Sequence, residues 1–277
     1  MDRYAVIGNP IAHSKSPSIH AAFARQTGES LAYAARLAPL DGFAASVLAF
    51  RAEGGRGANV TVPFKLEAFA LADRHAPRAL AAGAVNTLAF GDDGIFGDNT
   101  DGAGLVRDLV HNLGIELGGR SVLLLGAGGA ARGVILPLLA ERPAALTIAN
   151  RSADKAEMLA QRFADAAGGT RLSASALAAL NAPHYDIIIN ATAASLADEA
   201  PAVPARVYAH CALAYDMMYA KNDTPFVRAA RAGGARAGAD GLGMLVEQAA
   251  ESFLLWRGIR PDTTVVLAEL RRQMRAG

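Results

Sequence analysis

The feature that most constrains this 277-residue chain is a run of leucines that passes directly into a cluster of glycines. Residues 123–125 are all leucine and predict a buried strand, and residues 126–131 follow with the spacing G-x-G-x-x-A. In this pattern Gly126 permits a tight turn, Gly128 lets the backbone approach a pyrophosphate, and Ala131 keeps the next helix close to the sheet. Because the N-terminus of that helix presents free N–H groups and a positive dipole end, it favours phosphate. The pattern therefore predicts a dinucleotide-binding βαβ unit.

The end of the second strand of this unit indicates which dinucleotide binds. A unit that binds NAD usually carries an acidic residue there, which holds the ribose 2′-hydroxyl. This chain has Asn150, Arg151 and Ser152 instead, with Lys155 one helical turn further on. The planar guanidinium of Arg151 can pair with a 2′-phosphate, and Ser152 and Lys155 can add contacts. We therefore predict NADP rather than NAD as the cofactor.

Short apolar runs alternate with longer amphipathic segments along the whole chain, which predicts an α/β protein. They form two series, and so two domains are expected. The strands of the first series are expected at residues 4–7, 31–37, 58–60, 84–90 and 95–96, with a hairpin turn at 91–94 and a helix that Ser16 caps and Gly28 closes. Those of the second are expected at residues 121–125, 145–149, 186–189 and 212–215, before two helices at 244–256 and 263–274.

Composition excludes several classes of function. Apolar residues make up 52% and charged residues 19%, which is typical of a globular protein with a sizeable core. The net charge of +1 and the aromatic content of 6% argue against nucleic acid or a membrane surface as a partner. No stretch of about 18 residues is apolar enough to span a membrane.

The single cysteine and the scattered histidines add two expectations. Cys211 is the one cysteine, so no internal disulfide is possible, and a reducing compartment, the cytoplasm, is predicted. Its apolar neighbours favour a core position over a nucleophile. His13 and His20 lack further clustered ligands, so we expect no metal ion.

Polar side chains gather at the turns of the N-terminal half, in residues 14–17, 59–65, 86–87 and 98–102. In an open α/β sheet, ligands bind beyond the carboxyl ends of the strands. Hydroxyl, amide, ammonium and carboxylate groups together suit a polyhydroxylated carboxylic acid. Each residue also has a purely structural interpretation. Ser16 can cap a helix, and Asn59 and Asn86 can satisfy the backbone of turns.

Ordered segments along nearly the whole chain resemble the shikimate dehydrogenase family. The segments are AVIGNPIAHSKSP (5–17), GANVTVPFK (57–65), AGAVNTL (82–88), GDNTDG (97–102), GAGGA (126–130), NR (150–151), INAT (189–192), YDM (215–217) and ADGLGMLV (239–246).

The resemblance implies a domain organisation and a reaction. Residues 1–101 are expected to form an α/β substrate-binding and catalytic domain, and residues 102–241 a Rossmann-type NADP-binding domain. Residues 242–277 are expected to form helices that return to the first domain. The implied reaction is the NADPH-dependent, reversible reduction of 3-dehydroshikimate to shikimate, on the route to chorismate and the aromatic amino acids. The partner is then a small-molecule substrate, and a homodimer is possible.

The resemblance also assigns roles to individual residues. Lys65 and Asp101 are the implied catalytic pair, with Lys65 acting as a proton donor or as an electrostatic stabiliser. The implied substrate contacts are Ser14, Ser16, Asn59, Thr61, Asn86, Tyr215 and Gln248. The implied cofactor contacts are Gly126, Ala127, Gly128, Gly129, Ala130, Asn150, Arg151, Ser152, Lys155, Leu213 and Gly241. In one loop, residues 193–196 read Ala-Ala-Ser-Leu where the family usually has serines and a glycine.

Two alternatives stay open. A quinate/shikimate dehydrogenase of the same family often uses NAD, but the absence of an acid at Asn150-Arg151 argues against it. A non-catalytic binding protein with the same fold is the other alternative. The presence of both Lys65 and Asp101 argues against that one.

Overall fold

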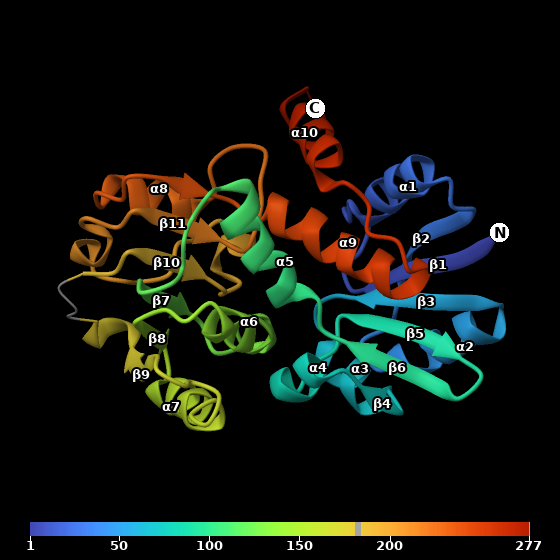
Figure 1. Cartoon of the computed structure of the whole chain (residues 1–277), viewed down its shortest axis with the longest axis horizontal. Helices are drawn as coiled ribbons and strands as arrows, with labels where there is room; N and C mark the ends of the chain where they lie inside the picture. Colours follow the sequence, from blue (N-terminus) through green and yellow to red (C-terminus); the bar gives the residue numbers. More distant parts are fainter. Residues whose placement is uncertain (181–183, 277) are drawn as a thin grey trace. The chain divides into compact units, whose positions relative to one another are not determined.

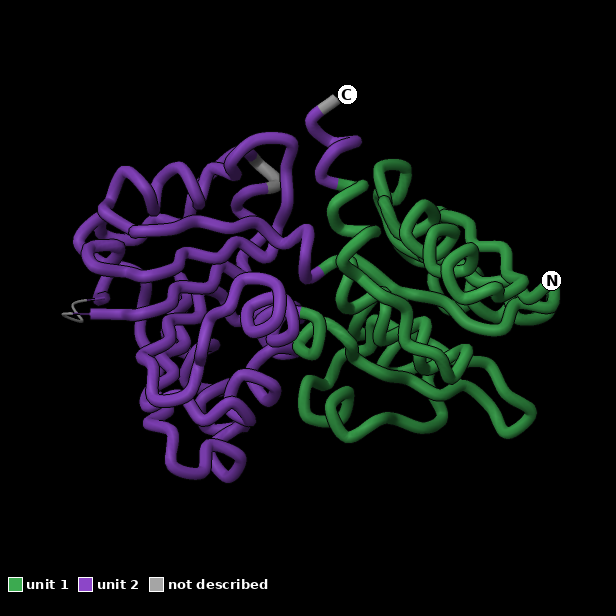
Figure 2. Tube along the Cα trace, turned by 45° about the horizontal axis from the view of Figure 1, so that its top comes forward, with its two compact units in different colours: residues 1–104, 245–270 green, residues 105–244, 271–277 purple. Residues whose placement is uncertain are grey.

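The computed structural model describes residues 1–180 and 184–276, and the chain divides into two compact units (Figure 2). Unit 1 comprises Met1–Gly104 and Leu245–Leu270, and unit 2 comprises Leu105–Met244 and Arg271–Gly277. The chain leaves unit 1 inside a helix, α5 (Asp101–Arg107). The domain limits expected at residues 101 and 241 stay a prediction.

Unit 1 contains a mixed six-stranded sheet, in the order β2-β1-β3-β5-β6-β4 (Figure 1). Its strands are β1 (Asp2–Gly8), β2 (Leu31–Leu37), β3 (Gly55–Val60), β4 (Arg74–His75), β5 (Thr87–Gly91) and β6 (Gly94–Asp98). Strand β1 is parallel to both β2 and β3, whereas β5 is antiparallel to β3 and β6. The carboxyl ends of β1, β3 and β6 and the amino end of β5 therefore lie at the same edge of the sheet.

The helices of unit 1 contribute side chains to its core, and several of them begin where a polar turn ends. They are α1 (Ser16–Thr27), α2 (Phe43–Ala52), α3 (Lys65–Leu71), α4 (Pro77–Ala82), the first residues of α5, most of α9 (Leu242–Arg257) and the first half of α10 (Thr263–Ala276). Phe43, Phe50 and Phe64 are almost completely buried in the core of this unit. The predicted hairpin at residues 91–94 is confirmed, because β5 and β6 pair on either side of it.

The start of α1 differs from the expectation. Ser16 is the first helical residue rather than the cap, which is Lys15, and Lys15 makes no side-chain capping bond. The reason is that Ser14 takes over part of the capping role, since its hydroxyl accepts a hydrogen bond from the backbone N–H of Ser16 at 3.3 Å. The predicted helix end is confirmed: Gly28 has a φ of 71°, the left-handed conformation that a closing glycine adopts readily.

Unit 2 contains a parallel six-stranded sheet in the order β12-β11-β10-β7-β8-β9. Its strands are β7 (Ser121–Leu125), β8 (Ala145–Asn150), β9 (Arg171–Ala176), β10 (Ile187–Asn190), β11 (Leu213–Asp216) and β12 (Gly238–Ala239). Read from β9, this is the order 3-2-1-4-5-6 of dinucleotide-binding sheets. The predicted α/β class, with a Rossmann-type unit, is confirmed.

The crossover helices of unit 2 are α6 (Gly129–Ala140), α7 (Ala153–Arg162) and α8 (Pro225–Ala232), and short 3-10 turns lie at Leu177–Ala179, Ala194–Ala197 and Ala205–Tyr208. One turn of π-helix, Asp108–Asn112, follows α5. Across residues 1–180 and 184–276, no helix combines the length and the apolar character that a membrane crossing demands.

Candidate functional site

The polar turns of unit 1 meet at one sheet edge. Asn59 of β3, Thr87 of β5 and Asp98 of β6 lie opposite one another in the register of three neighbouring strands. Thr61 follows β3 at the same edge, and a Cβ placed on Gly8 of β1 would come within 2.4 Å of its methyl group. Only glycine permits that approach, so Gly8 at the end of β1 determines how close Thr61 can lie to this strand.

Lys65 and Asp101 lie together at this edge, each as the first residue of a helix, α3 and α5 respectively. Lys65 Nζ donates to Asp101 Oδ2 at 2.5 Å, and the two side chains are only 19% and 8% exposed. The other carboxylate oxygen of Asp101 accepts a hydrogen bond from Asn86 Nδ2 at 2.8 Å. An ammonium with spare protons is thus held beside an enclosed carboxylate, an arrangement suited to delivering a proton to, or stabilising charge on, a substrate oxygen.

Gln248 of α9 completes this cluster within unit 1. Its Oε1 accepts from Asn86 Nδ2 at 3.3 Å and from Thr100 Oγ1 at 3.2 Å. Asn86 Oδ1 in turn accepts from the backbone N–H of Thr100 at 2.8 Å. The structure therefore brings Asn86, Gln248 and the Lys65–Asp101 pair together, as expected for residues of one site.

Arg78 is a supporting residue that the sequence analysis did not find. Its guanidinium donates to both carboxylate oxygens of Asp98, at 2.7 and 2.6 Å. Burial lowers the pKa of Arg78, but the hydrogen bonds and opposite charges of Asp98 and Glu251 together outweigh burial and raise it. Asp98 also accepts from the backbone N–H of Asn99, so Arg78 fixes the segment that leads to Asp101. No local pattern marks Arg78, because its partner lies 20 residues away.

The glycine turn of unit 2 has the geometry that a pyrophosphate requires. Gly126 has a φ of 111°, and a Cβ there would lie 3.1 Å from the carbonyl oxygen of Ala191. A Cβ on Gly128 or Gly129 would meet nothing within 4 Å, so space is open in front of the turn. Helix α6 begins at Gly129 without a side-chain cap, which leaves its first N–H groups for a ligand. These residues fit the phosphates of a dinucleotide.

The residues expected to distinguish NADP from NAD follow β8. Arg151, Ser152 and Lys155 are all exposed, at the start of α7. Asn150 Nδ2 donates to the carbonyl oxygen of Ser152 at 3.0 Å, which holds this turn in shape. The cationic side chains of Arg151 and Lys155 are therefore accessible to a 2′-phosphate.

Two expected ligand contacts lie inside strand β11 rather than at its end. Tyr215 is 0% and Leu213 is 3% exposed. The hydroxyl of Tyr215 donates to Asp108 Oδ2 at 2.6 Å, and burial, with the Asp108 carboxylate adding to it, raises the Tyr215 pKa well above 10. In the loop after the strand, Tyr219 is partly exposed and lines a cavity of about 280 Å³. Tyr219 is therefore better placed than Tyr215 to meet a ligand, a distinction that depends on where the strand ends.

The unusual loop at residues 193–196 is anchored through its one serine. Ser195 Oγ donates at 2.7 Å to Asp216 Oδ2, and Asp216 is completely buried at the end of β11. Asn190 Nδ2 donates to the other oxygen of the same carboxylate at 3.0 Å. The Ser195 hydroxyl thus ties this loop to the end of β11, and the same carboxylate joins β11 to the end of β10.

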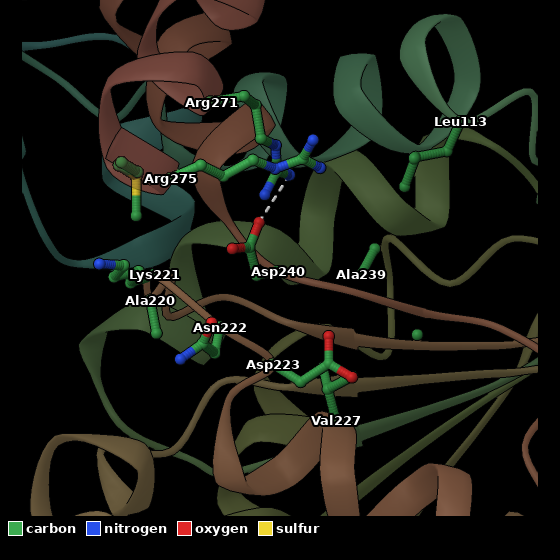
Figure 3. A pocket seen from close by; sticks show the side chains of 12 residues that line it. Leu113, Ala220, Lys221, Asn222, Asp223, Val227, Ala239, Asp240, Arg271 and Arg275 are labelled. Atoms are coloured by element: carbon green, nitrogen blue, oxygen red, sulfur yellow. Dashed lines mark ion pairs between the residues drawn. The ribbon is translucent and has the colours of Figure 1, made fainter. Parts of the chain in front are cut away.

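A cavity of about 460 Å³ in unit 2 is lined by Ala239 and Asp240, the two residues that precede the predicted cofactor contact Gly241 in the sequence (Figure 3). Figure 3 shows the ion pair between Arg271 and Asp240 at one side of it, with an N–O distance of 2.7 Å. At Gly241 a Cβ would lie 2.3 Å from the carbonyl oxygen of Met217, so only glycine fits. Among residues 1–180 and 184–276, no group of three or more His, Cys, Asp and Glu side chains is arranged to hold a metal ion.

The parallel sheet with its glycine turn, together with the enclosed Lys65–Asp101 pair, defines a class of protein: an oxidoreductase that uses a nicotinamide dinucleotide. Sequence profiles narrow the class. Residues 6–88 match the shikimate dehydrogenase substrate binding domain, residues 108–198 match shikimate / quinate 5-dehydrogenase, and residues 241–271 match the shikimate 5′-dehydrogenase C-terminal domain.

Individual relatives agree with the profiles. The chain is 69% identical to a shikimate dehydrogenase (NADP(+)) of Aromatoleum aromaticum, over 100% of this chain and 99% of that protein. It is 61% identical to the protein of the same name from Dechloromonas aromatica, over 99% and 98%. A solved shikimate 5-dehydrogenase of Thermus thermophilus, in complex with NADP(H) and shikimate, is 35% identical, with a TM-score of 0.85 over 99% and 100% of the two chains. This chain belongs to the shikimate dehydrogenase family.

Proposed function

We propose that this protein catalyses the NADPH-dependent, reversible reduction of 3-dehydroshikimate to shikimate. The observation that carries the proposal is the enclosed Lys65–Asp101 pair, with its N–O distance of 2.5 Å, at the sheet edge where the predicted substrate residues gather. The relatives named shikimate dehydrogenase (NADP(+)) span the full chain and support the same substrate and cofactor.

The chain's own residues manage a proton during the reaction. Bound NADPH supplies the hydride, which leaves negative charge on the oxygen of the reduced carbonyl. Lys65 stabilises that charge and is positioned to donate a proton to it. Asp101 holds the Lys65 ammonium in place, and Asn86 orients Asp101 through its 2.8 Å hydrogen bond. In the oxidation of shikimate the same groups act in reverse.

The substrate's carboxylate and hydroxyls are recognised by the polar residues of unit 1. We assign direct contacts to Ser14, Thr61 and Gln248, which are partly exposed, and to the more enclosed Ser16, Asn59 and Asn86. In unit 2 we assign a substrate contact to Tyr219 in the place first predicted for Tyr215, because Tyr215 is completely buried and bonded to Asp108.

The cofactor contacts are proposed for unit 2. The turn Gly126–Ala130 would hold the pyrophosphate of NADP, and residues 150–152 with Lys155 would hold its 2′-phosphate. Gly241 and Leu213 are the other two predicted cofactor contacts. Leu213 is only 3% exposed, so its side chain packs within the sheet and offers the cofactor little surface.

An assay of NADPH absorbance with 3-dehydroshikimate tests the proposed reaction directly. The competing candidate is a quinate/shikimate dehydrogenase that uses NAD, so quinate with NAD⁺ is the parallel assay. Turnover of 3-dehydroshikimate with NADPH supports the proposal. Efficient oxidation of quinate with NAD⁺, and no reaction with NADPH, contradicts it.

The proposal includes two further properties. The first is a homodimer, for which the exposed Leu37 (64%) and Leu40 (67%), at and just beyond the end of the edge strand β2, provide an apolar surface. Light scattering after size-exclusion chromatography tests it, and a monomer in the micromolar range contradicts it. The second is a cytoplasmic location, where NADPH is supplied by metabolism, and cell fractionation tests that.

A further inference from the structure

Tyr33 joins the substrate side of unit 1 although no motif contains it. It lies on the edge strand β2, and its hydroxyl donates to Asn59 Oδ1 of β3 at 2.7 Å. Strand β1 lies between these two strands, so the Tyr33 side chain reaches across it. The hydroxyl therefore acts on a residue two strands away.

The ring of Tyr33 is held in a fixed orientation. It stacks on His20 with the ring centroids 4.2 Å apart and the planes within 6°. Trp256 packs against the same tyrosine at 6.3 Å. His20 is 0% exposed, and neither of its ring nitrogens has a hydrogen-bond partner in the described part of the chain. Burial lowers the pKa of His20 to about 3, so His20 packs as a neutral ring.

Asn59 has one orientation that satisfies all of its neighbours. Its Nδ2 group donates to Ser252 Oγ at 2.9 Å and to Thr87 Oγ1 at 3.0 Å. Both acceptors are completely buried, and Asn59 itself is 5% exposed. Its Oδ1 must then face a donor, which Tyr33 provides. Without that donor, an enclosed carbonyl oxygen loses its partner.

The hydrogen bonds continue from Asn59 to the catalytic pair. Thr87 Oγ1 donates to Asn86 Oδ1 at 2.9 Å, and Asn86 Nδ2 donates to Asp101 Oδ1 at 2.8 Å. Asp101 then holds Lys65. The bonds form a continuous and almost wholly buried path from the Tyr33 hydroxyl to the carboxylate beside the reacting oxygen.

Burial raises the pKa of the Tyr33 hydroxyl well above its ordinary value. The hydroxyl therefore keeps its proton and remains available as the donor to Asn59.

We propose that Tyr33 is a positioning residue of the substrate site, which acts by orienting Asn59. The proposal rests on the proposed function, because it concerns the same site. Its consequence is that loss of one hydroxyl on an edge strand weakens recognition of shikimate and leaves NADP binding unchanged.

The test compares Tyr33→Phe with a matched control, Tyr4→Phe. Tyr33→Phe keeps the stacked ring and removes only the hydroxyl. Tyr4 is opposite Tyr33 on β1, and its hydroxyl contacts Arg257 rather than Asn59. We expect Tyr33→Phe to raise KM for shikimate by roughly 2- to 13-fold, the equivalent of one neutral hydrogen bond. The KM for NADP should stay level, and Tyr4→Phe should change neither constant.

A double-mutant cycle with Asn59→Ala distinguishes positioning from a general loss of stability. If Tyr33 acts through Asn59, Tyr33→Phe should have little further effect on KM once Asn59 is alanine. Equal multiplicative effects in both backgrounds, or an unchanged KM for shikimate in Tyr33→Phe, would overturn the proposal. If the wild-type enzyme turns over shikimate and only these expectations fail, the proposed function stands without the Tyr33 role. If the wild type shows no such turnover, both fail.

Discussion

Substitution of Lys65 by methionine should separate the catalytic role of the Lys65–Asp101 pair from its structural role. Methionine keeps most of the apolar stem and removes the charge. A positioned proton donor is worth ~10²–10⁴-fold in rate, so turnover should fall by about that factor. NADPH should still bind, because Lys65 belongs to unit 1 and the glycine turn to unit 2.

The structure also predicts a cost in stability. The Asp101 side chain is only 8% exposed, and without Lys65 its charge retains the hydrogen bond from Asn86 but no cation. Breaking a buried pair by removing one partner costs about 3–5 kcal/mol, and we expect the lower end because Lys65 is 19% exposed. For a chain of this size, about 3 kcal/mol lowers the thermal midpoint by roughly 6–12 °C.

The second substitution, Asp101→Asn, supplies the decisive comparison. Added to Lys65→Met, it removes the unpaired charge and keeps an acceptor for Asn86, so the double variant should recover much of the lost stability. Its turnover should stay as low as that of Lys65→Met, because the proton donor is still missing. The assays are NADPH absorbance for rate and calorimetry for the thermal midpoint. Near-normal turnover in Lys65→Met, or a double variant less stable than that single variant, would refute this reasoning.

Five further substitutions test other parts of the protein. Arg151→Ala should raise KM for NADP by roughly 10- to 150-fold, the equivalent of one hydrogen bond to a charged group, and should leave KM for NAD nearly unchanged. Equal use of both cofactors by the wild type would contradict the assignment. Gln248→Ala should weaken shikimate binding, measured by calorimetric titration, while NADP affinity stays level; unchanged shikimate affinity would remove Gln248 from the site. Tyr219→Phe should raise KM for shikimate or lower kcat. Tyr215→Phe should mainly lower the thermal midpoint, because it removes the 2.6 Å hydrogen bond to the buried Asp108. The reverse pattern would restore Tyr215 as the substrate contact. The pKa of His20 is about 3 in the folded chain and near 6.5 in the unfolded chain. Between these pH values the unfolded state binds a proton on His20 that the folded state does not. The free energy of unfolding should therefore fall by up to ~1.4 kcal/mol for each unit by which the pH drops. Urea unfolding at about pH 7 and about pH 5 should show a smaller loss in His20→Phe than in the wild type, and equal losses would show that another group dominates.

The sequence alone was sufficient for the class of fold and for the cofactor turn. Strands of two to seven residues alternate with helices, and Gly126 and Gly128 lie where a strand meets a helix. Local spacing encodes both features, because the backbone conformation of a turn and the burial of a strand depend on neighbouring residues. The motif containing Lys65 and the one containing Asp101 were likewise visible, through their resemblance to a family.

Only the tertiary structure decided which side chains meet. Tyr33 and Asn59 are 26 residues apart, and Arg78 and Asp98 are 20 apart, so no local pattern relates them. Tyr215 lies only four residues before Tyr219. Because β11 ends at Asp216, Tyr215 lies inside the sheet and Tyr219 in the loop beyond it. Hydrogen bonds between distant segments depend on strand order and register, and these are set by the packing of the whole unit rather than by the residues on either side.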